Sequence, residues 1–212
     1  NPKKKKIKHL VAKPEVLEEI REKIFAKKQG GAKMMEIYLD NGATTKPCKE
    51  CVEKVVEMLT VKYGNPSSLH EKGFEAEQEI ESARAVIAQN LNANASEFYF
   101  PSGGTEANNI AILGSAAANK KRGKKIVTTA MEHSSVYNSA KALEKEGFDV
   151  VYLKPDENGQ VTLEQIEKAV DEETILVSMM LVNNEVGTVF PVEKIKKIII
   201  QKKSPALLHI DA

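Results

Sequence analysis

Short apolar runs alternate with amphipathic stretches from about residue 98 to the end of this 212-residue chain. The runs are rich in β-branched and aromatic residues, as in buried strands, and the stretches between them carry apolar residues at helical spacing. The pattern predicts strands at 98–100, 125–129, 150–153, 175–181 and 206–210. It predicts helices at 105–119, 134–146, 163–170 and 192–201. This alternation indicates an α/β fold, with a mostly parallel sheet flanked by helices.

The pattern is less regular before residue 98. Residues 36–39 are expected to form a short strand, and Pro47 is placed to begin a helix that reaches about residue 61. The apolar face of that helix comprises Val52, Val55, Val56 and Leu59. A longer helix is expected at about 71–90, where the residues predicted to face inward are Phe74, Ile80, Ala83 and Ile87.

The first 33 residues differ in composition from the rest. Lysines crowd 3–8, Pro14 is placed to begin a short helix, and Gly30 and Gly31 end the segment. We expect a basic extension at 1–33, with a flexible segment and a short helix, and the N-terminal part of a larger domain at 34–212. The lysines are interpreted as a solvated tail, with an arm that binds nucleic acid or an acidic partner as the alternative.

The overall composition is that of a globular protein. Hydrophobic residues make up 42% of the chain and charged residues 29%, and the net charge of +1 gives no case for a nucleic-acid partner. No apolar run approaches membrane-span length and no signal-peptide core is evident, so no membrane association is expected and a cytoplasmic location is predicted. Two cysteines agree with a reducing compartment.

The first candidate site is a glycine turn, Gly103-Gly104, between the strand expected at 98–100 and the helix that follows. Such a turn leaves backbone N–H groups unpaired at a helix N-terminus, and together with the helix dipole they can seat an anion, most often a phosphate. Thr105 could add a hydroxyl donor. The alternative is a tight turn capped by Ser102 or Thr105, with Glu106 favourable in the first turn.

Polar residues also follow three of the expected strands. His133, Asn184 and Asp211 each lie at or just beyond a strand end. Ligands of parallel sheets bind outside the carboxyl ends of the strands, so these side chains would converge with the glycine turn on one edge. Alternatively, His133 could cap the next helix, Asn184 could belong to a turn, and Asp211 could be a surface carboxylate. Four such positions together favour a cofactor site.

Six motifs occur in one order along the chain: Leu39-Asp40-Asn41-Gly42-Ala43-Thr44-Thr45, Gly64-Asn65-Pro66-Ser67-Ser68, Ser102-Gly103-Gly104-Thr105-Glu106, Glu132-His133, Val182-Asn183-Asn184-Glu185-Val186-Gly187 and His209-Ile210-Asp211-Ala212. This set resembles the cysteine desulfurases (NifS/IscS-like) of the class V, fold-type I pyridoxal-phosphate enzymes. The resemblance extends over about residues 36–212.

The resemblance implies pyridoxal 5'-phosphate as cofactor and a role for each candidate. Gly104 and Thr105 would hold the cofactor phosphate at the helix N-terminus. His133 would lie over the pyridine ring and act as the catalytic proton shuttle. Asn184 would hydrogen-bond the phenolic oxygen of the ring. Asp211 would pair with the pyridine nitrogen and keep it protonated.

The resemblance also implies an activity and partners. Enzymes of this family convert L-cysteine to L-alanine and pass the sulfur as a persulfide to iron–sulfur scaffold or tRNA-thiolation acceptors, usually as homodimers. A selenocysteine lyase or another class V aminotransferase is the alternative within the class. A non-catalytic interaction protein that works through its basic N-terminal helix is the alternative of another class.

The family pattern continues beyond the ring-binding aspartate with segments that this sequence does not contain. These are a Gln, a Ser-x-His-Lys segment whose lysine forms the internal Schiff base, and the loop with the sulfur-accepting cysteine. We therefore expect this chain to be a fragment or truncated form that is inactive by itself, with a split enzyme completed by another chain as the alternative.

Cys48 and Cys51 suggest a redox or metal site, because thiols at a helix N-terminus have lowered pKa values. The sequence has no second Cys/His pair at zinc spacing, and no strand leads into the cysteines as in thioredoxin-like folds. We interpret the spacing as incidental, leave the pair out of the site, and expect no metal.

Overall fold

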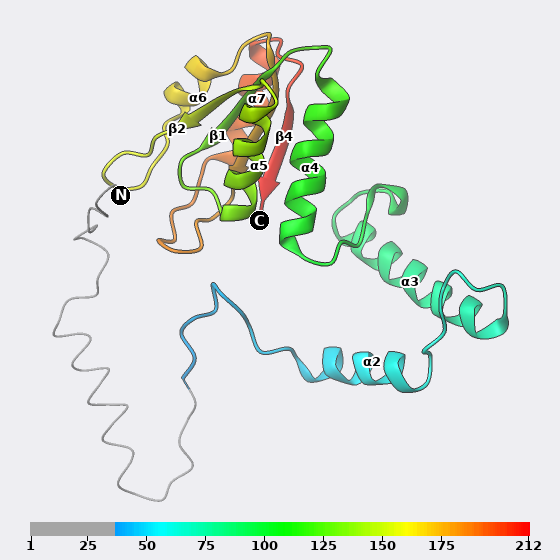
Figure 1. Cartoon of the computed structure of the whole chain (residues 1–212). Coiled ribbons are helices and arrows are strands. Elements are labelled where there is room, and N and C mark those ends of the chain that lie inside the picture. Colours follow the sequence, from blue (N-terminus) through cyan, green and yellow to red (C-terminus); the bar gives the residue numbers. More distant parts are fainter. Residues whose placement is uncertain (1–36) are drawn as a thin grey trace, which may run out of the picture.

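The computed structural model describes residues 37–212, and its centre is a parallel sheet of four strands (Figure 1). The extension expected at 1–33 lies outside the described residues. The strands lie in the order β2-β1-β3-β4. They are β1 (Lys125–Thr129), β2 (Asp149–Leu153), β3 (Thr174–Met180) and β4 (Leu207–Asp211). The four strands expected after residue 120 are thereby confirmed.

Helices cover both faces of this sheet, which confirms the predicted α/β class. On one face lie α4 (Gly104–Asn119) and α5 (Ser134–Lys145), and on the other lie α6 (Leu163–Ala169) and α7 (Val192–Gln201).

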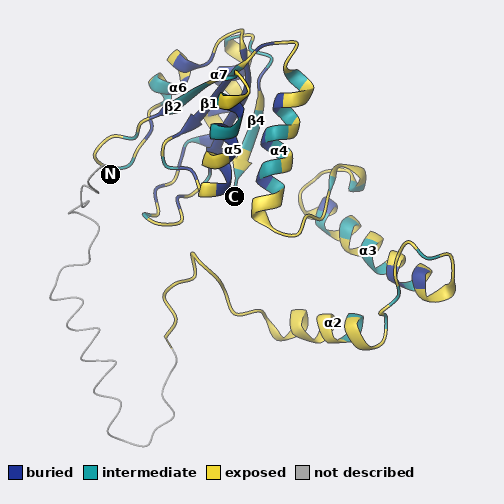
Figure 2. Ribbon diagram, viewed as in Figure 1, coloured by how far each residue is buried: buried dark blue, intermediate teal, exposed yellow. Residues whose placement is uncertain are grey.

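Successive residues of β1 pack into the hydrophobic clusters on opposite faces of the sheet. Ile126 packs in the cluster that contains Ile112 of α4, and Val127 packs in the cluster that contains Ile166 of α6. Burying such a side chain fully stabilises the fold by about 1.5–3 kcal/mol. Figure 2 shows that buried residues concentrate in the sheet and the helix faces against it.

The register of the sheet sets the position of the candidate site. Because β3 pairs in parallel with both β1 and β4, the carboxyl ends of these strands meet at one edge. At that edge Met180 of β3 is paired with Asp211 of β4. The loops after β1 and β3 leave the sheet on the same side.

Three further elements precede α4 and lie beside the layered part of the molecule (Figure 1). They are α2 (Lys49–Thr60), α3 (Glu71–Asn90) and the short 3-10 helix η2 (Ala95–Glu97). Helices were expected at the positions of α2 and α3, and both are present. No residue of α2 is buried, and its apolar face is exposed at Val52, Val55, Val56 and Leu59.

The inward face predicted for α3 is only partly correct. Phe74 and Ala83 are exposed, whereas Ile80 and Ile87 are half-buried. An amphipathic pattern predicts which face a helix can bury, but not which element covers it. Among residues 37–212, no layer of the sheet domain reaches the exposed faces of α2 and α3.

The strands expected at 98–100 and 36–39 are corrected by the structure. Residues 98–100 and the described residues 37–39 have no strand partner among the described residues, and a strand needs one for its backbone hydrogen bonds. Instead of being buried, Tyr99 is 79% exposed and Phe100 is 50% exposed. The Phe98 and Phe100 rings contact edge to face at a centroid distance of 5.0 Å, and the Arg84 guanidinium lies 5.4 Å from the Phe100 centroid.

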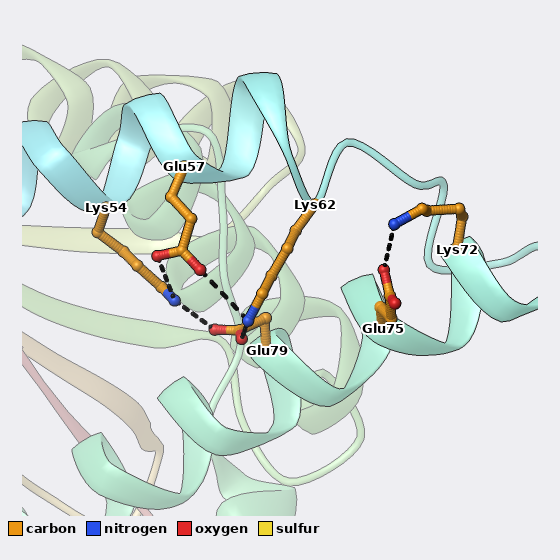
Figure 3. Close-up of polar contacts among 6 residues, drawn as sticks. All are labelled: Lys54, Glu57, Lys62, Lys72, Glu75 and Glu79. Carbon is orange, nitrogen blue, oxygen red and sulfur yellow. Dashed lines mark hydrogen bonds and ion pairs between the residues drawn. The ribbon is translucent and has the colours of Figure 1, made fainter.

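Ion pairs join α2 to α3 (Figure 3). Lys54 Nζ lies 2.8 Å from Glu79 Oε2 and 3.1 Å from Glu57 Oε2. Lys62, just after α2, also pairs with Glu79, and its Nζ lies 3.3 Å from Glu57 Oε1. Hydrogen bonds from Lys54 and Lys62 lower the pKa of Glu79 to about 2. Since no residue of α2 is buried, this half-buried network of ion pairs provides an attachment of α2 to α3.

Replacing Glu79 by Gln should therefore loosen α2 without unfolding the sheet domain. A carboxylate with a lowered pKa contributes stability above its ordinary pKa of 4.5, and the contribution is lost as the pH falls towards 2. At neutral pH we expect faster amide hydrogen exchange in α2 of Glu79→Gln, with a smaller difference from wild type at high salt. Glu77→Gln is the matched control, since no ion pair of Glu77 is described. Unchanged exchange in Glu79→Gln would contradict this role.

Candidate functional site

A hydrogen-bonded chain of four residues crosses the carboxyl edge of the sheet. The Asn108 side chain on α4 donates from Nδ2 to Asp211 Oδ2 at 3.1 Å and to Ser135 Oγ at 2.9 Å. Ser135 Oγ in turn lies 2.8 Å from His133 Nδ1. Two of the predicted site residues, Asp211 and His133, are thus connected through two side chains that the sequence analysis did not identify.

The hydrogen-bond donors around His133 indicate which nitrogen of its neutral ring carries the proton. Asn108 uses both amide hydrogens, one towards Asp211 and one towards Ser135, so the Ser135 hydroxyl hydrogen is directed to His133 Nδ1. The Ser135 backbone N–H also donates to Nδ1, at 3.2 Å. Nδ1 is therefore an acceptor, and the neutral ring carries its proton on Nε2.

His133 is also the N-cap of α5. The alternative considered from the sequence, that this histidine caps the following helix, is correct. The cap engages only Nδ1, and the residue is exposed. Capping thus holds the ring through Nδ1, and no hydrogen bond to Nε2 is present among the described residues.

Gly104 and Thr105 form the first turn of α4, one helical turn before Asn108. The N-cap is Gly103, and neither Ser102 nor Thr105 caps the helix with its side chain. A Cβ atom built on Gly103 or Gly104 would meet nothing within 4 Å, so the space in front of the first turn is open. Glu106 Oε2 accepts a hydrogen bond from the Ser102 backbone N–H at 2.5 Å, which holds the turn and lowers the pKa of Glu106.

The loop after β3 is held by Asn183, the neighbour of the predicted site residue Asn184. Asn183 is buried and donates to the Met131 carbonyl at 3.0 Å, and its Oδ1 accepts from the Glu185 and Val186 backbone N–H groups. Asn184 is exposed, and no side-chain hydrogen bond joins it to the other candidates among the described residues. The structure therefore brings Asn184 to the correct edge but not into the hydrogen-bonded chain.

The loop with Asn184 also approaches an earlier motif. A Cβ atom on Gly42 would come within 3.1 Å of the Asn184 carbonyl oxygen. A side chain at position 42 would crowd this carbonyl. The loop at 40–45 therefore contributes to the same edge of the sheet.

Glu132 is a buried carboxyl group beside this network, with 9% of its surface exposed. Its Oε1 accepts from the Thr129 hydroxyl at 2.7 Å and from the Met180 backbone N–H at 3.2 Å. Its Oε2 is buried without a hydrogen-bond partner among the described residues. Burial, with a smaller contribution from the negative charge of Asp211, raises the pKa of Glu132 to about 7, although both hydrogen bonds oppose the shift.

Asn108 and Ser135 are functional candidates that the sequence analysis missed, although one signal was available. Asn108, Ile112 and Ala116 recur every fourth residue and are the buried residues of α4. A carboxamide on an otherwise apolar helix stripe must find partners inside the protein. Ser135 carried no such signal, because serine is common in the first turn of a helix.

No helix among residues 37–212 is long and apolar enough to cross a membrane, and these residues contain no group of three or more side chains placed to hold a metal ion.

Residues 37–212 match the family model for aminotransferase class V. The chain belongs to the class-V aminotransferase family. A cysteine desulfurase IscS from Clostridium botulinum is 43% identical over 177 residues, which cover 84% of this chain and 44% of that relative. These similarities confirm the resemblance to NifS/IscS-like cysteine desulfurases on which the sequence analysis relied.

Solved structures agree with this family. A NifS-like protein superposes with a TM-score of 0.80 at 42% identity, over 84% of this chain and 49% of that protein. SspA, solved in complex with cysteine, gives a TM-score of 0.75 at 35% identity, over 82% of this chain and 50% of SspA. The fold is therefore that of the NifS-like, fold-type I enzymes. The class-V chain spans about half the length of the relatives that it matches.

Replacing Asn108 by Ala should destabilise the protein, because Asp211 and Ser135 lose a buried donor. We expect a loss of about 1–3 kcal/mol in the free energy of unfolding by urea. Asn119→Ala is the control on the same helix, because its amide donates only to the Ser115 carbonyl one turn away, and it should change stability by about 0.5 kcal/mol or less. Equal effects of the two substitutions would argue against the bridging role of Asn108.

Replacing Glu132 by Gln should change how stability depends on pH. A carboxyl group whose pKa rises from 4.5 unfolded to about 7 folded contributes stability below pH 4.5, and this contribution is lost as the pH rises towards 7. Relative to Glu132→Gln, the wild type should lose on the order of 3 kcal/mol between pH 4.5 and pH 7. Denaturant titrations of both proteins across this pH range measure the free energy of unfolding. If the two free energies changed with pH in parallel, Glu132 would have an ordinary pKa.

Proposed function

We propose that this chain provides the cofactor-binding surface of a pyridoxal-phosphate-dependent cysteine desulfurase. The reaction is conversion of L-cysteine to L-alanine, with the sulfur passed as a persulfide to a protein acceptor such as an iron–sulfur scaffold or a tRNA-thiolation protein. The observation that carries the proposal is the chain Asp211–Asn108–Ser135–His133 at the carboxyl edge of a NifS-like sheet.

The groups at this edge match the chemistry of pyridoxal phosphate. A carboxylate at the end of β4 suits a protonated ring nitrogen, and the open first turn of α4 suits a phosphate. The exposed imidazole of His133 suits the face of an aromatic ring. When bound, the cofactor supplies an electron sink for the α-carbon of an amino acid.

The residues at this edge of the sheet have distinct roles in the proposal. Asp211 holds a proton on the ring nitrogen, and Asn108 fixes the carboxylate by binding Oδ2. His133, anchored through Nδ1, presents Nε2 for proton transfer to and from the substrate. Gly104 and Thr105 bind the phosphate with first-turn N–H groups and the threonine hydroxyl, and Asn184 binds the phenolic oxygen.

The similar proteins support the activity and substrate class. The relative from Clostridium botulinum is a cysteine desulfurase, and SspA was solved with cysteine. The homodimer, the sulfur acceptor and the cytoplasmic location expected from the sequence stay predictions.

Replacing Asp211 by Asn in the native protein tests the proposal, because it removes the charge that favours the protonated ring. A hydrogen bond to a charged group contributes about 1.5–3 kcal/mol, so the affinity for pyridoxal phosphate should fall about 10- to 100-fold. Absorbance titration of the cofactor measures this affinity, and alanine release from L-cysteine measures the activity. Asp149→Asn, at the opposite edge of the sheet, is the matched control and should leave both unchanged.

The competing functions give different results in the same assays. Release of alanine from L-selenocysteine but not from L-cysteine would indicate a selenocysteine lyase instead. Alanine formation only in the presence of a keto acid would indicate an aminotransferase. Failure of the native protein to bind pyridoxal phosphate would contradict the proposal and favour a non-catalytic interaction protein.

A further inference from the structure

The two cysteines of the chain lie against each other at the start of α2. Cys48 is the N-cap and Cys51 is in the first turn, and the two Sγ atoms are 3.2 Å apart. Both residues are free thiols and both are exposed. Nothing in the family assignment uses them, and they belong to none of the six motifs.

The geometry allows a bond between the two sulfur atoms with little movement. A disulfide needs an S–S distance of about 2.05 Å, so the two Sγ atoms must approach by roughly 1 Å. Both side chains are exposed and free to rotate. Cys48 has extended backbone angles, φ −68° and ψ 160°, and its carbonyl accepts the first helical hydrogen bond of α2, from the Val52 backbone N–H at 3.2 Å.

The surroundings suit thiol chemistry. Backbone N–H groups of the first turn of α2 point towards the N-cap, where no side chain caps them, and helix N-termini favour thiolates. Contact with Cys48 raises the pKa of Cys51, so Cys51 retains its proton more strongly than an isolated thiol. Cys48 is the N-cap, where the uncapped N–H groups of the first turn point, and its position assigns it as the attacking thiol.

We propose that Cys48 and Cys51 form a thiol–disulfide exchange site that reacts with low-molecular-weight disulfides such as oxidised glutathione. The Cys48 thiolate attacks one sulfur of the disulfide, which gives a mixed disulfide and releases one thiolate. Cys51, after losing its proton, attacks Cys48 Sγ, forms the internal disulfide and releases the second thiolate. The two released thiolates take up the two protons, so the protein is oxidised by two electrons and the small disulfide is reduced to two thiols.

Oxidation would change the order of α2. No described residue of this helix is buried, and half-buried ion pairs join it to α3. A disulfide between the N-cap and the first turn would hold that turn covalently and slow its local opening. The inference does not depend on the proposed desulfurase function.

Equilibration of the 212-residue chain with defined ratios of reduced to oxidised glutathione tests the proposal. The fraction with the internal disulfide is measured by acid quenching, alkylation and intact mass, because the chain has only two cysteines. The same titration in denaturant is the reference for a flexible Cys-x-x-Cys segment. We expect the equilibrium constant for the internal disulfide to be at least about tenfold larger in the folded chain, or about 30 mV in potential. Equal constants would overturn the proposal.

Single substitutions test the assigned order of attack. Cys51→Ser should accumulate the mixed disulfide of Cys48 with glutathione, because no second thiol can displace it. Cys48→Ser should react more slowly with oxidised glutathione than Cys51→Ser does. A faster reaction of Cys48→Ser would overturn the assignment of Cys48 as the attacking thiol. In the oxidised wild type, amide exchange in the first turn of α2 should be slower than in the reduced protein, and equal exchange would overturn the inferred effect on α2.

Discussion

The parallel pairing of β3 with both β1 and β4 is the constraint on which the rest of the structure depends. β3 is buried along its whole length, and its register with β4 places Met180 beside Asp211. The same pairing directs the loops after β1 and β3 to the edge where α4 and α5 begin. Asn108 can bridge Asp211 and Ser135 only because these helix N-termini and strand ends share that edge.

The layered part of the fold could be predicted from the sequence because each strand and helix there has a recognisable pattern of apolar residues. Strands such as 125–129 are short and β-branched, and their neighbours in the chain are helices whose apolar faces cover them. His133 and Asp211 could be placed at one edge by the rule for parallel sheets alone. The hydrogen-bonded connection between them could not be predicted, since it passes through Asn108, which is 103 residues from Asp211 in the chain.

The failures lie where burial depends on partners that the local pattern does not specify. Residues 98–100 look like a buried strand because Phe, Tyr and Phe follow one another, but no strand pairs with them in the described residues. The valines of α2 have helical spacing and still face solvent. The motif directed attention to Asn184, whose cofactor role stays a prediction, and gave no sign that Asn183 makes the buried hydrogen bonds of this loop. The contact between Cys48 and Cys51 is local, yet spacing alone could not distinguish it from chance.

The most direct measurement of the central claim is an NMR titration of the isotope-labelled protein with pyridoxal phosphate. We expect the largest shifts on the Gly104 and Thr105 amides, the Asn108 side-chain amide and the His133 ring. Before addition, the neutral His133 ring should carry its proton on Nε2. Shifts at these groups would locate the phosphate at α4 and the ring at the carboxyl edge. Shifts confined to other parts of the molecule, or a ring protonated on Nδ1, would contradict the account.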